Sequence, residues 1–248
     1  MEQGKPRFGM NSNALHCLAM LFMLLDHAYH TVGGGLWLTI IGRLAFPIFA
    51  FLIVEGFYHT SNVKRYKLRL LLFALISEIP FNWVLAAGPL YPFHQNTLFT
   101  LLLGLVAIEA IEKGKTCEKQ LESWLLQIAV PLLCMAAAEI GMTDYNWVGV
   151  VTIMGFYLLR NYKLPQFILL FYLNQFVIGG RVFPLFGGAF ELKMQVLAVL
   201  ALPLIWLYNG EKGKDLQIAG KTIKIGYWFY PAHLVLLCLL RYWKWSMM

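Results

Sequence analysis

The chain carries little charge for its length. Asp, Glu, Lys and Arg make up 13% of its 248 residues, whereas a water-soluble domain contains roughly a quarter. Apolar residues make up 59%. The sequence also lacks a P-loop, a nucleophile elbow and the glycine pattern of dinucleotide-binding folds. These absences argue against a soluble domain and against the enzyme classes that those motifs mark.

The four cysteines are isolated, and they show neither the spacing of a metal site nor that of a disulfide framework. We therefore expect packing cysteines and no bound metal. No internal repeat or low-complexity tract is visible, so residues 1–248 are predicted to form a single integral membrane domain. Lys5 and Arg7 precede an apolar run as in a signal peptide, but Asp26 and His27 interrupt that run. It is predicted to be a retained first helix.

Apolar runs near the ~20 residues needed to span a bilayer recur from one end of the chain to the other. They predict an all-α membrane protein, a polytopic bundle of about nine transmembrane helices. The predicted spans are Asn13–Thr31, Leu36–Phe57, Leu68–Ala86, Asn96–Ile111, Leu121–Ile140, Asn146–Leu159, Leu164–Ile178, Phe190–Leu207 and Gly226–Tyr242.

The formal net charge of +7 could suggest nucleic-acid binding, but the cations follow alternate loops between the predicted spans. Fifteen of the twenty Lys and Arg lie on one predicted side, namely Lys5, Arg7, Lys64, Arg65, Lys67, Arg69, Lys113, Lys115, Lys119, Arg160, Lys163, Lys212, Lys214, Lys221 and Lys224. The positive-inside rule then places the N-terminus in the cytoplasm and the C-terminus outside. Topology therefore accounts for the charge without nucleic acid as a partner.

Prolines interrupt four predicted spans, at Pro47, Pro80, Pro131 and Pro203. Because proline has no N–H, each one frees the carbonyl four residues earlier and bends the helix. Pro47 frees the carbonyl of Arg43, and Pro80 frees that of Ile76. Both predicted kinks lie beside ionisable residues.

Five ionisable residues fall inside predicted spans, namely Asp26, His27, Arg43, Glu55 and Glu78. A charge near the centre of a spanning helix costs about 2.5–3.5 kcal/mol, so each needs a partner or a function. A rise of about 1.5 Å per residue places Asp26, His27 and Arg43 about 20 Å above the cytoplasmic edge, and Glu78 at about 15 Å. Asp26 and Arg43 are therefore predicted to form an ion pair, whose simplest role is mutual neutralisation.

His27 is left without a partner in this scheme. A buried histidine can be a hydrogen-bonded packing residue, and that interpretation stays open. An imidazole that titrates near neutral pH is also suited to general-base catalysis in a low-dielectric pocket beside carboxylates. The outer half of the predicted bundle or its rim also holds Glu78, Asn82, Asn96 and Asp144. Their convergence favours a site around His27.

A second group is predicted at the cytoplasmic mouth of the bundle, namely Glu55, His59, Arg69, Tyr230 and His233. Topology explains the loop lysines that ring this mouth. A basic rim is also where a phosphate-rich ligand from the cytoplasm would dock.

Six ordered segments resemble the TraX family, membrane proteins named for acetylation of the F-pilin N-terminus in conjugation. They are LLDH at 24–27, GRLAFPIFAFLIVEG at Gly42–Gly56, SEIPFN at Ser77–Asn82, QNTLFTLLLG at Gln95–Gly104, DYNWVGV at Asp144–Val150 and WFYPAHL at Trp228–Leu234. The resemblance spans nearly the whole chain. Asn146 stands where the Asp-Tyr motif of the family has glycine.

TraX proteins are similar in turn to transmembrane acyltransferases, including the acyltransferase-3 group and the lysosomal heparan-α-glucosaminide N-acetyltransferase. In those proteins a first-helix histidine is taken as the catalytic residue, and His27 occupies the matching position. His16 stands where the acyltransferase-3 pattern has arginine. The resemblance implies a multi-pass protein of the bacterial cytoplasmic (inner) membrane that uses cytoplasmic acetyl-CoA as cosubstrate and acetylates an amine, or less readily a hydroxyl, outside.

The resemblance also implies roles for the other candidate residues. Asp26 and Arg43 would hold the first two helices together and set the field around His27. Glu78 is counted with His27, Asp26 and Arg43 among the catalytic residues, and Glu78 and Asn82 would position the acceptor or tune His27. Acceptor-binding residues would be Asn82, Asn96 and Asp144, and CoA-binding residues would be Tyr230, His233, Glu55, His59 and Arg69. The acceptor itself, whether peptide, glycan or small amine, is left open by the sequence.

Two other classes of protein fit the same residues. Asp26, His27 and Glu78 could relay protons in a proton-coupled transporter of small solutes, although no inverted repeat is found. A non-catalytic scaffold would leave the buried charges without a purpose. Binding of CoA or acetyl-CoA separates the enzyme from the transporter.

Overall fold

The structure is a computed structural model that describes residues 9–247 apart from 87, 214–216, 219–220 and 223–224. Lys5, Arg7, Lys214 and Lys224 of the predicted basic set lie outside the described residues. The α-helices are α1 (Ser12–Val32), α2 (Trp37–Gly42), α3 (Ala45–His59), α4 (Val63–Ala86), α5 (Thr97–Lys115), α6 (Gln120–Trp124), α7 (Val130–Ile140), α8 (Asn146–Leu158), α9 (Lys163–Tyr172), α10 (Ala201–Trp206) and α11 (Ile225–Ser246). Two π-helices, η1 (Leu125–Ala129) and η2 (Leu173–Val177), and two 3₁₀ segments, η3 (Phe186–Gly188) and η4 (Met194–Leu200), complete the helical part.

Three helical stretches among the described residues are long and apolar enough to cross a membrane, namely Trp37–His59, Val63–Leu85 and Gln120–Ile140. They match the second, third and fifth predicted spans. The stretch Met194–Trp206 and helix α8 are shorter apolar helices. The remaining predicted spans fall on α1, α5, α9 with η2, and α11.

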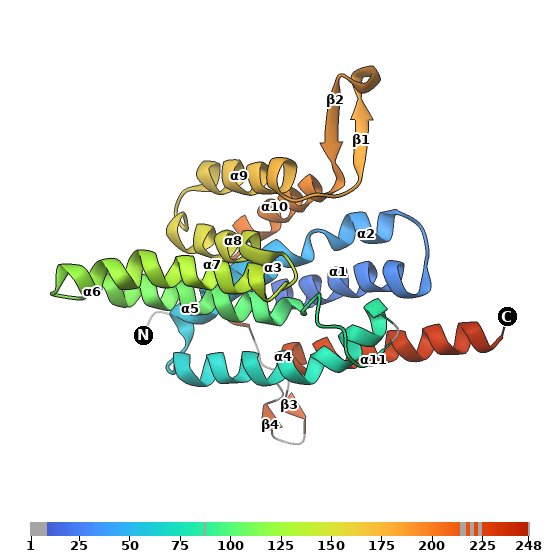
Figure 1. Cartoon of the computed structure of the whole chain (residues 1–248), viewed down its shortest axis with the longest axis horizontal. Coiled ribbons are helices and arrows are strands. Elements are labelled where there is room, and N and C mark those ends of the chain that lie inside the picture. The colour runs from blue at the N-terminus through green and yellow to red at the C-terminus, as the bar shows by residue number, and fades with distance from the viewer. Residues whose placement is uncertain (1–8, 87, 214–216, 219–220, 223–224, 248) are drawn as a thin grey trace.

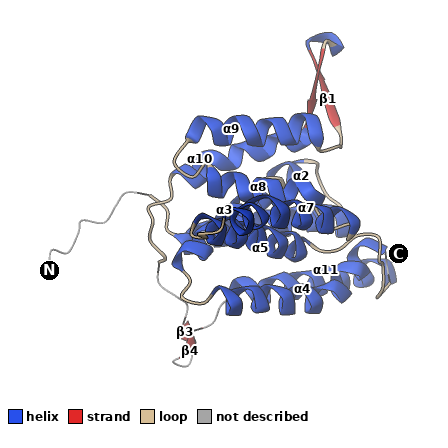
Figure 2. Ribbon diagram, turned by 60° about the vertical axis from the view of Figure 1, so that its left-hand side comes forward, coloured by secondary structure: helices blue, strands red, loops and turns tan. Residues whose placement is uncertain are grey.

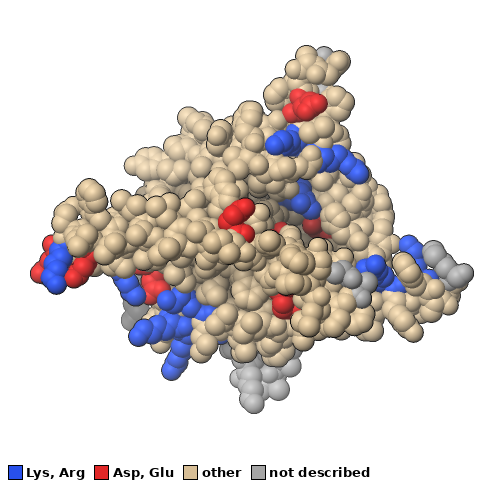
Figure 3. Space-filling model, viewed as in Figure 1, with Lys and Arg blue, Asp and Glu red and all other residues tan. Residues whose placement is uncertain are grey.

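Large apolar side chains cover the outside of the bundle. Leu68 on α4 is 65% exposed, Leu133 on α7 is 66% exposed and Leu239 on α11 is 62% exposed. On the face shown in Figure 3, Lys and Arg gather at the left, at the right and around the base of the projecting hairpin, and most of the surface between these groups is uncharged. A soluble protein rarely leaves so much apolar surface in water, whereas lipid tails match it. The chain is a membrane protein.

The helices form three layers, as Figure 2 shows. One outer layer holds α4 and α11, the other holds α9 and α10, and the remaining long helices lie between them. The Phe73 ring stacks on Tyr227, and Arg241 donates to the carbonyl of Val84. The first contact joins the middle of α4 to the start of α11 and the second joins the ends of both helices, so the two helices run parallel (Figure 1).

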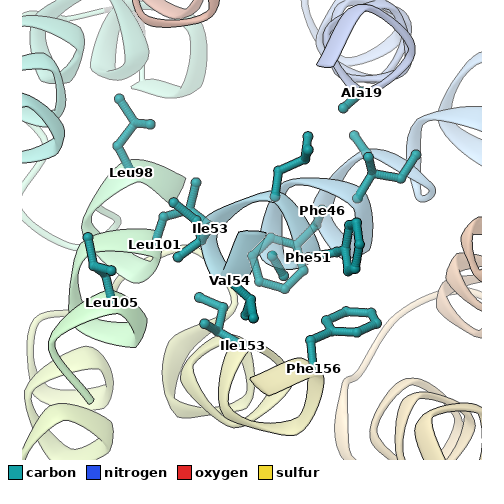
Figure 4. Packing of buried hydrophobic residues seen from close by; sticks show 14 of the residues in the cluster. Ala19, Phe46, Phe51, Ile53, Val54, Leu98, Leu101, Leu105, Ile153 and Phe156 are labelled. Carbon is teal, nitrogen blue, oxygen red and sulfur yellow. The ribbon is translucent and has the colours of Figure 1, made fainter. Parts of the chain in front are cut away.

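Helix α3 is the centre of the core. In the most apolar part of Trp37–His59, 61% of the residues are buried, against 17% in Gln120–Ile140. Figure 4 shows residues of α3 packing against α1, α5 and α8, with Val54 close to Ile153. At Gly104, where α5 meets α8, any side chain would collide with Ile153. The site therefore rests on a tightly packed helix, whereas α6 and α7 lie at the edge.

The second predicted span is broken at Arg43, as Pro47 predicts. Helix α2 ends at Gly42 and α3 begins at Ala45. Because Pro47 has no N–H to donate to Arg43, the α-helical ladder cannot continue through this turn. Non-α turns likewise precede Pro131 and Pro203, which follow η1 and η4. The break places Arg43 between two helices.

The eighth predicted span begins four residues too early, because Phe190–Lys193 is strand β2. It pairs antiparallel with β1 (Val182–Leu185), and the turn holds Gly187 and Gly188 at φ of 70° and 94°. Hydropathy alone does not separate an apolar strand from a helix. The all-α prediction misses this hairpin, which projects from the bundle in Figure 1, and a two-residue pairing between β3 (Gln217–Ile218) and β4 (Lys221–Thr222).

Candidate active site

The predicted ion pair between Asp26 and Arg43 is present. Arg43 Nη2 donates to Asp26 Oδ1, and Thr39 Oγ1 donates to the same oxygen at 2.6 Å. Arg43 Nη1 donates to Gln195 Oε1 of η4 at 3.1 Å, and Nε donates to the Thr39 carbonyl at 3.3 Å. The side chains of Asp26 and Arg43 are only 18% and 17% exposed. The pair thus joins α1, the α2–α3 break and η4.

Gly42 allows the close approach that this pair needs. A side chain at this position would collide with the Cβ and Oδ1 of Asp26. Since α1 and α2 are antiparallel neighbours across a tight turn, any larger residue would push Asp26 away from Arg43. Close packing of α1 against α2 therefore explains why glycine stands at position 42, the first residue of the segment Gly42–Gly56 that resembles TraX.

His27 points from α1 toward α11, where His233 meets it. His27 Nδ1 lies 2.7 Å from His233 Nε2, and the two rings are nearly parallel with centroids 5.0 Å apart. His233 is 3% exposed, whereas His27 keeps part of its surface open. His27 is therefore neither sealed in the core nor turned fully outward.

The hydrogen bonds decide which nitrogens carry protons. His233 Nδ1 lies 2.8 Å from the carbonyl of Phe229, which can only accept, so Nδ1 carries the proton. In a neutral ring Nε2 of His233 is then an acceptor, and His27 Nδ1 must donate to it. That leaves His27 Nε2 unprotonated. The arrangement supplies a proton acceptor whose orientation is fixed from the opposite side of the ring.

A polar rim lies beside this dyad, at the turn between α7 and α8. The Tyr230 ring lies 6.4 Å from that of His27, and Tyr230 also faces Thr97. Thr97 Oγ1 donates to Asp144, and His94 Nε2 lies 3.6 Å from Asp144 Oδ1. The charge of Asp144 acts on His27. The described residues contain no group of His, Cys, Asp and Glu that could hold a metal ion.

The rim has an unusual backbone. Tyr145 and Asn146 adopt left-handed conformations with φ of 66° and 45°. Asn tolerates this region better than other side chains, but tyrosine seldom adopts it and is strained there. The Tyr145 ring stacks on Phe46 at 3.8 Å, and it lies against Arg43 and Gln195. The strain places an aromatic wall beside the ion pair.

Glu78 and Asn82 lie one turn apart on α4. Asn96 donates to Glu78 Oε2 through Nδ2 at 2.6 Å and through its backbone N–H at 3.3 Å. Asn96 Nδ2 also donates to the Ala74 carbonyl, and its Oδ1 caps α5 by accepting from Leu98 N–H. All polar groups of the Asn96 side chain are engaged, so Asn96 positions Glu78.

The predicted mouth group lies in three places. Glu55, 3% exposed, pairs with Arg160 at 2.7 Å and with His59 at 3.6 Å. Arg69 lies over the Tyr66 and Tyr227 rings. Tyr230 and His233 join His27 instead. Tyr230 and His233 lie away from the predicted mouth because α4 and α11 pack in parallel. Tyr227 lies level with Phe73, so His233, six residues later, lies near the turn of α4 that carries Glu78.

The sequence did not identify four residues of this site. Thr39 and Gln195 hold Arg43, and His94 and Thr97 hold Asp144. Thr39 lies one helical turn before Arg43, which was a usable indication. Gln195 is the one polar side chain in the apolar run 194–206 of the sequence, and its isolation was another. His94 and Thr97 gave no such sign.

The sequence matches the family described as TraX protein over residues 11–241. The chain belongs to the TraX family. A curated relative is the "Probable fimbrial assembly protein FimC, serogroup H1" of Dichelobacter nodosus. It is 28% identical, and the match covers 90% of this chain and 93% of the relative. No solved structure matches this TraX chain.

All six segments that resemble TraX contribute to one place in this structure. They supply Asp26 and His27, Arg43, Glu78 and Asn82, Asn96 and Thr97, Asp144 and Tyr145, and Tyr230 and His233. Asn146 has a left-handed φ, a conformation that glycine adopts freely and that asparagine adopts more readily than most residues. This explains why asparagine can stand where the family motif has glycine. The family resemblance and the geometry therefore indicate the same site.

We expect a pH dependence from the rim of this TraX site. The interaction with Asp144 raises the pKa of His94 above 6.5, although burial opposes it. Burial also opposes ionisation of Asp144, but hydrogen bonds from His94 and Thr97 lower the pKa of Asp144 below 3.8. The stabilisation from His94 is complete below pH 6.5 and is lost as the pH rises through its folded pKa; that from Asp144 is lost as the pH falls through its own.

The thermal midpoint of the protein in detergent should therefore fall as the pH rises from about 6 to about 9, and His94→Gln should flatten that slope. Asp144→Asn should flatten it equally, because either change removes the pair. An unchanged slope in both variants would show that this pair does not couple to unfolding.

Proposed function

We propose that this chain is a transmembrane acetyltransferase that moves acetyl from cytoplasmic acetyl-CoA to an amine, or less readily a hydroxyl, on the outer side of the bacterial inner membrane. The observation that carries the proposal is the hydrogen-bond chain from His27 through His233 to the Phe229 carbonyl, which orients His27 and leaves Nε2 of the neutral ring as a proton acceptor. A general base needs a free nitrogen lone pair in a fixed direction.

The chemistry balances with His27 alone as acid and base. The acceptor nitrogen attacks the thioester carbonyl, the new N–C bond forms, and the C–S bond breaks. The acceptor proton passes to His27 Nε2 and then to the departing CoA thiolate. The carboxylates of Asp26 and Asp144 lie near enough to stabilise the imidazolium between these two steps.

The proposed orientation has about nine spans, with the N-terminus in the cytoplasm. The end of α5 and the starts of α4 and α9 lie at one end of the molecule in Figure 1, and these segments carry much of the described basic set. Lys64 and Arg65 at the start of α4 are exposed there. Exposed cations at that end suit the phosphates of CoA.

A pilin-type peptide with a free amine is the acceptor that the comparisons favour. The TraX family is associated with pilin acetylation, and the relative from Dichelobacter nodosus is named as a probable fimbrial assembly protein. An exported subunit would present its amine on the far side of the membrane from acetyl-CoA. The partly open His27 in the outer half is consistent with that direction of approach.

Ligand binding by the purified chain in detergent tests the proposal. Acetyl-CoA at a hundredfold excess over its dissociation constant should stabilise the fold by about 2.7 kcal/mol, while ATP, which shares its adenine and phosphates, should do less. Labelled acetyl should also pass to a peptide with a free N-terminus. No stabilisation at about 1 mM acetyl-CoA and no transfer would favour the transporter instead.

A further inference from the structure

Two buried oxygen atoms on α4 have no hydrogen-bond partner in the structure. Glu78 Oε1 is one, because Asn96 engages only Oε2. Asn82 Oδ1 is the other, because the Asn82 amide donates through Nδ2 to the Pro89 carbonyl at 3.3 Å. Asn82 is 2% exposed. Both atoms are acceptors, and one belongs to a carboxylate.

A buried acceptor without a donor is unfavourable, so these oxygens indicate a ligand that supplies donors. None of the Lys, Arg and His side chains in the described part of the chain forms an ion pair with Glu78, and the nearby His94 is paired with Asp144. The ligand must therefore bring at least two donor hydrogens and a positive charge. A primary ammonium group has three such hydrogens on one compact cation.

The unpartnered oxygen of Glu78 and the base His27 lie around the same side chain, that of Tyr230. Tyr230 senses the charges of both Glu78 and Asp144, and its ring lies 6.4 Å from that of His27. Because Glu78 and Asn82 are four residues apart, they lie on the same face of α4. We propose that Glu78 and Asn82 form a binding site for a primary ammonium group, which selects an amine acceptor over a hydroxyl and delivers it protonated.

The assignment of this ammonium as the acceptor rests on the proposed acetyl transfer, whereas the ammonium site itself does not. The bound ammonium gives one proton to His27 Nε2, which releases it to solvent, and becomes a neutral amine. When that amine attacks, its second proton passes through His27 Nε2 to the departing thiolate. The products are the N-acetyl amide, free CoA and one proton, so charge and atoms balance.

Glycinamide hydrochloride is a suitable probe, and N-acetylglycinamide is its uncharged match. Thermal unfolding of the full chain in detergent, at constant ionic strength, should show stabilisation by glycinamide and none by N-acetylglycinamide. Glu78→Gln keeps the shape and an acceptor for Asn96 but removes the charge. It should raise the half-stabilising glycinamide concentration at least about tenfold.

Glu122→Gln is the matched control, because Glu122 in the short helix α6 pairs only with the exposed Lys119 among the described ion pairs. It should leave the glycinamide response unchanged. Asn82→Ala is a second variant, and it should weaken the response by about three- to tenfold. It keeps the test open if Glu78→Gln does not yield a monodisperse protein.

Three results would overturn the site: no glycinamide stabilisation up to about 100 mM, equal stabilisation by N-acetylglycinamide, or an unchanged response in folded Glu78→Gln. The first would leave ordered water as the partner of the two oxygens. Glycinamide binding without acetyl transfer would uphold the site and count against the enzyme. Transfer to amines without selective glycinamide binding would uphold the enzyme and count against the site.

Discussion

Replacing His27 by glutamine should slow acetyl transfer by about 10²- to 10⁴-fold, the usual contribution of a general base. Glutamine can still donate to His233, so the helix contact survives while the proton acceptor is lost. Single-turnover transfer of labelled acetyl to glycinamide, in detergent or nanodiscs, measures the effect directly. The loss should appear in the rate of the chemical step, and the dissociation constant for acetyl-CoA should stay within about threefold of the wild-type value.

His16→Gln is the matched control for that experiment. His16 lies on the same helix, but its Nδ1 bonds the Ser12 carbonyl at 2.8 Å near the start of α1. It should transfer acetyl at nearly the wild-type rate. If His27→Gln turned over like the unmodified protein, the proposed base would have to be sought among the other residues of the site.

Arg43→Met should destabilise the protein by about 3 kcal/mol, the second-largest effect that we expect. The substitution keeps much of the side-chain volume but leaves the Asp26 carboxylate largely buried, with Thr39 as its hydrogen-bond donor and the half-exposed His30 at 3.9 Å. It also removes the donor to Gln195. Equilibrium unfolding in mixed micelles with increasing SDS gives the free energy of unfolding.

The double variant Asp26→Leu with Arg43→Met should recover part of this loss, since no charge is then left unpaired. Lys119→Met is the control on an exposed pair, and it should cost at most about 0.5 kcal/mol. A loss for Arg43→Met no larger than that for Lys119→Met would show that the Asp26–Arg43 pair adds nothing to the fold.

The sequence was sufficient for features that depend on depth in the membrane. Asp26 and Arg43 came out at matched heights on adjoining helices, and they pair. Pro47 predicted a break at Arg43, and the helix breaks there. Both follow from counting residues along a helix and from the missing N–H of proline, which require no knowledge of tertiary packing.

The same reasoning could not give the direction that each helix faces. His233 was expected at the cytoplasmic mouth, yet it contacts His27, because this contact depends on how α11 packs beside both α1 and α4. Gln195 reaches Arg43 across 152 residues of sequence. A hydropathy window also merges the end of a hairpin with the helix after it, which hid strand β2. Long-range packing decided the first two cases, whereas the third is a local hairpin.

The carbonyl of Phe229 has a consequence for the energy supply of the cell. It accepts the Nδ1 proton of His233 and cannot pass a proton onward. The His27–His233 pair therefore cannot conduct protons beyond Phe229. A proton accepted at His27 Nε2 must therefore leave from that same nitrogen. The protein would then modify exported substrates without short-circuiting the proton gradient across the membrane in which it sits.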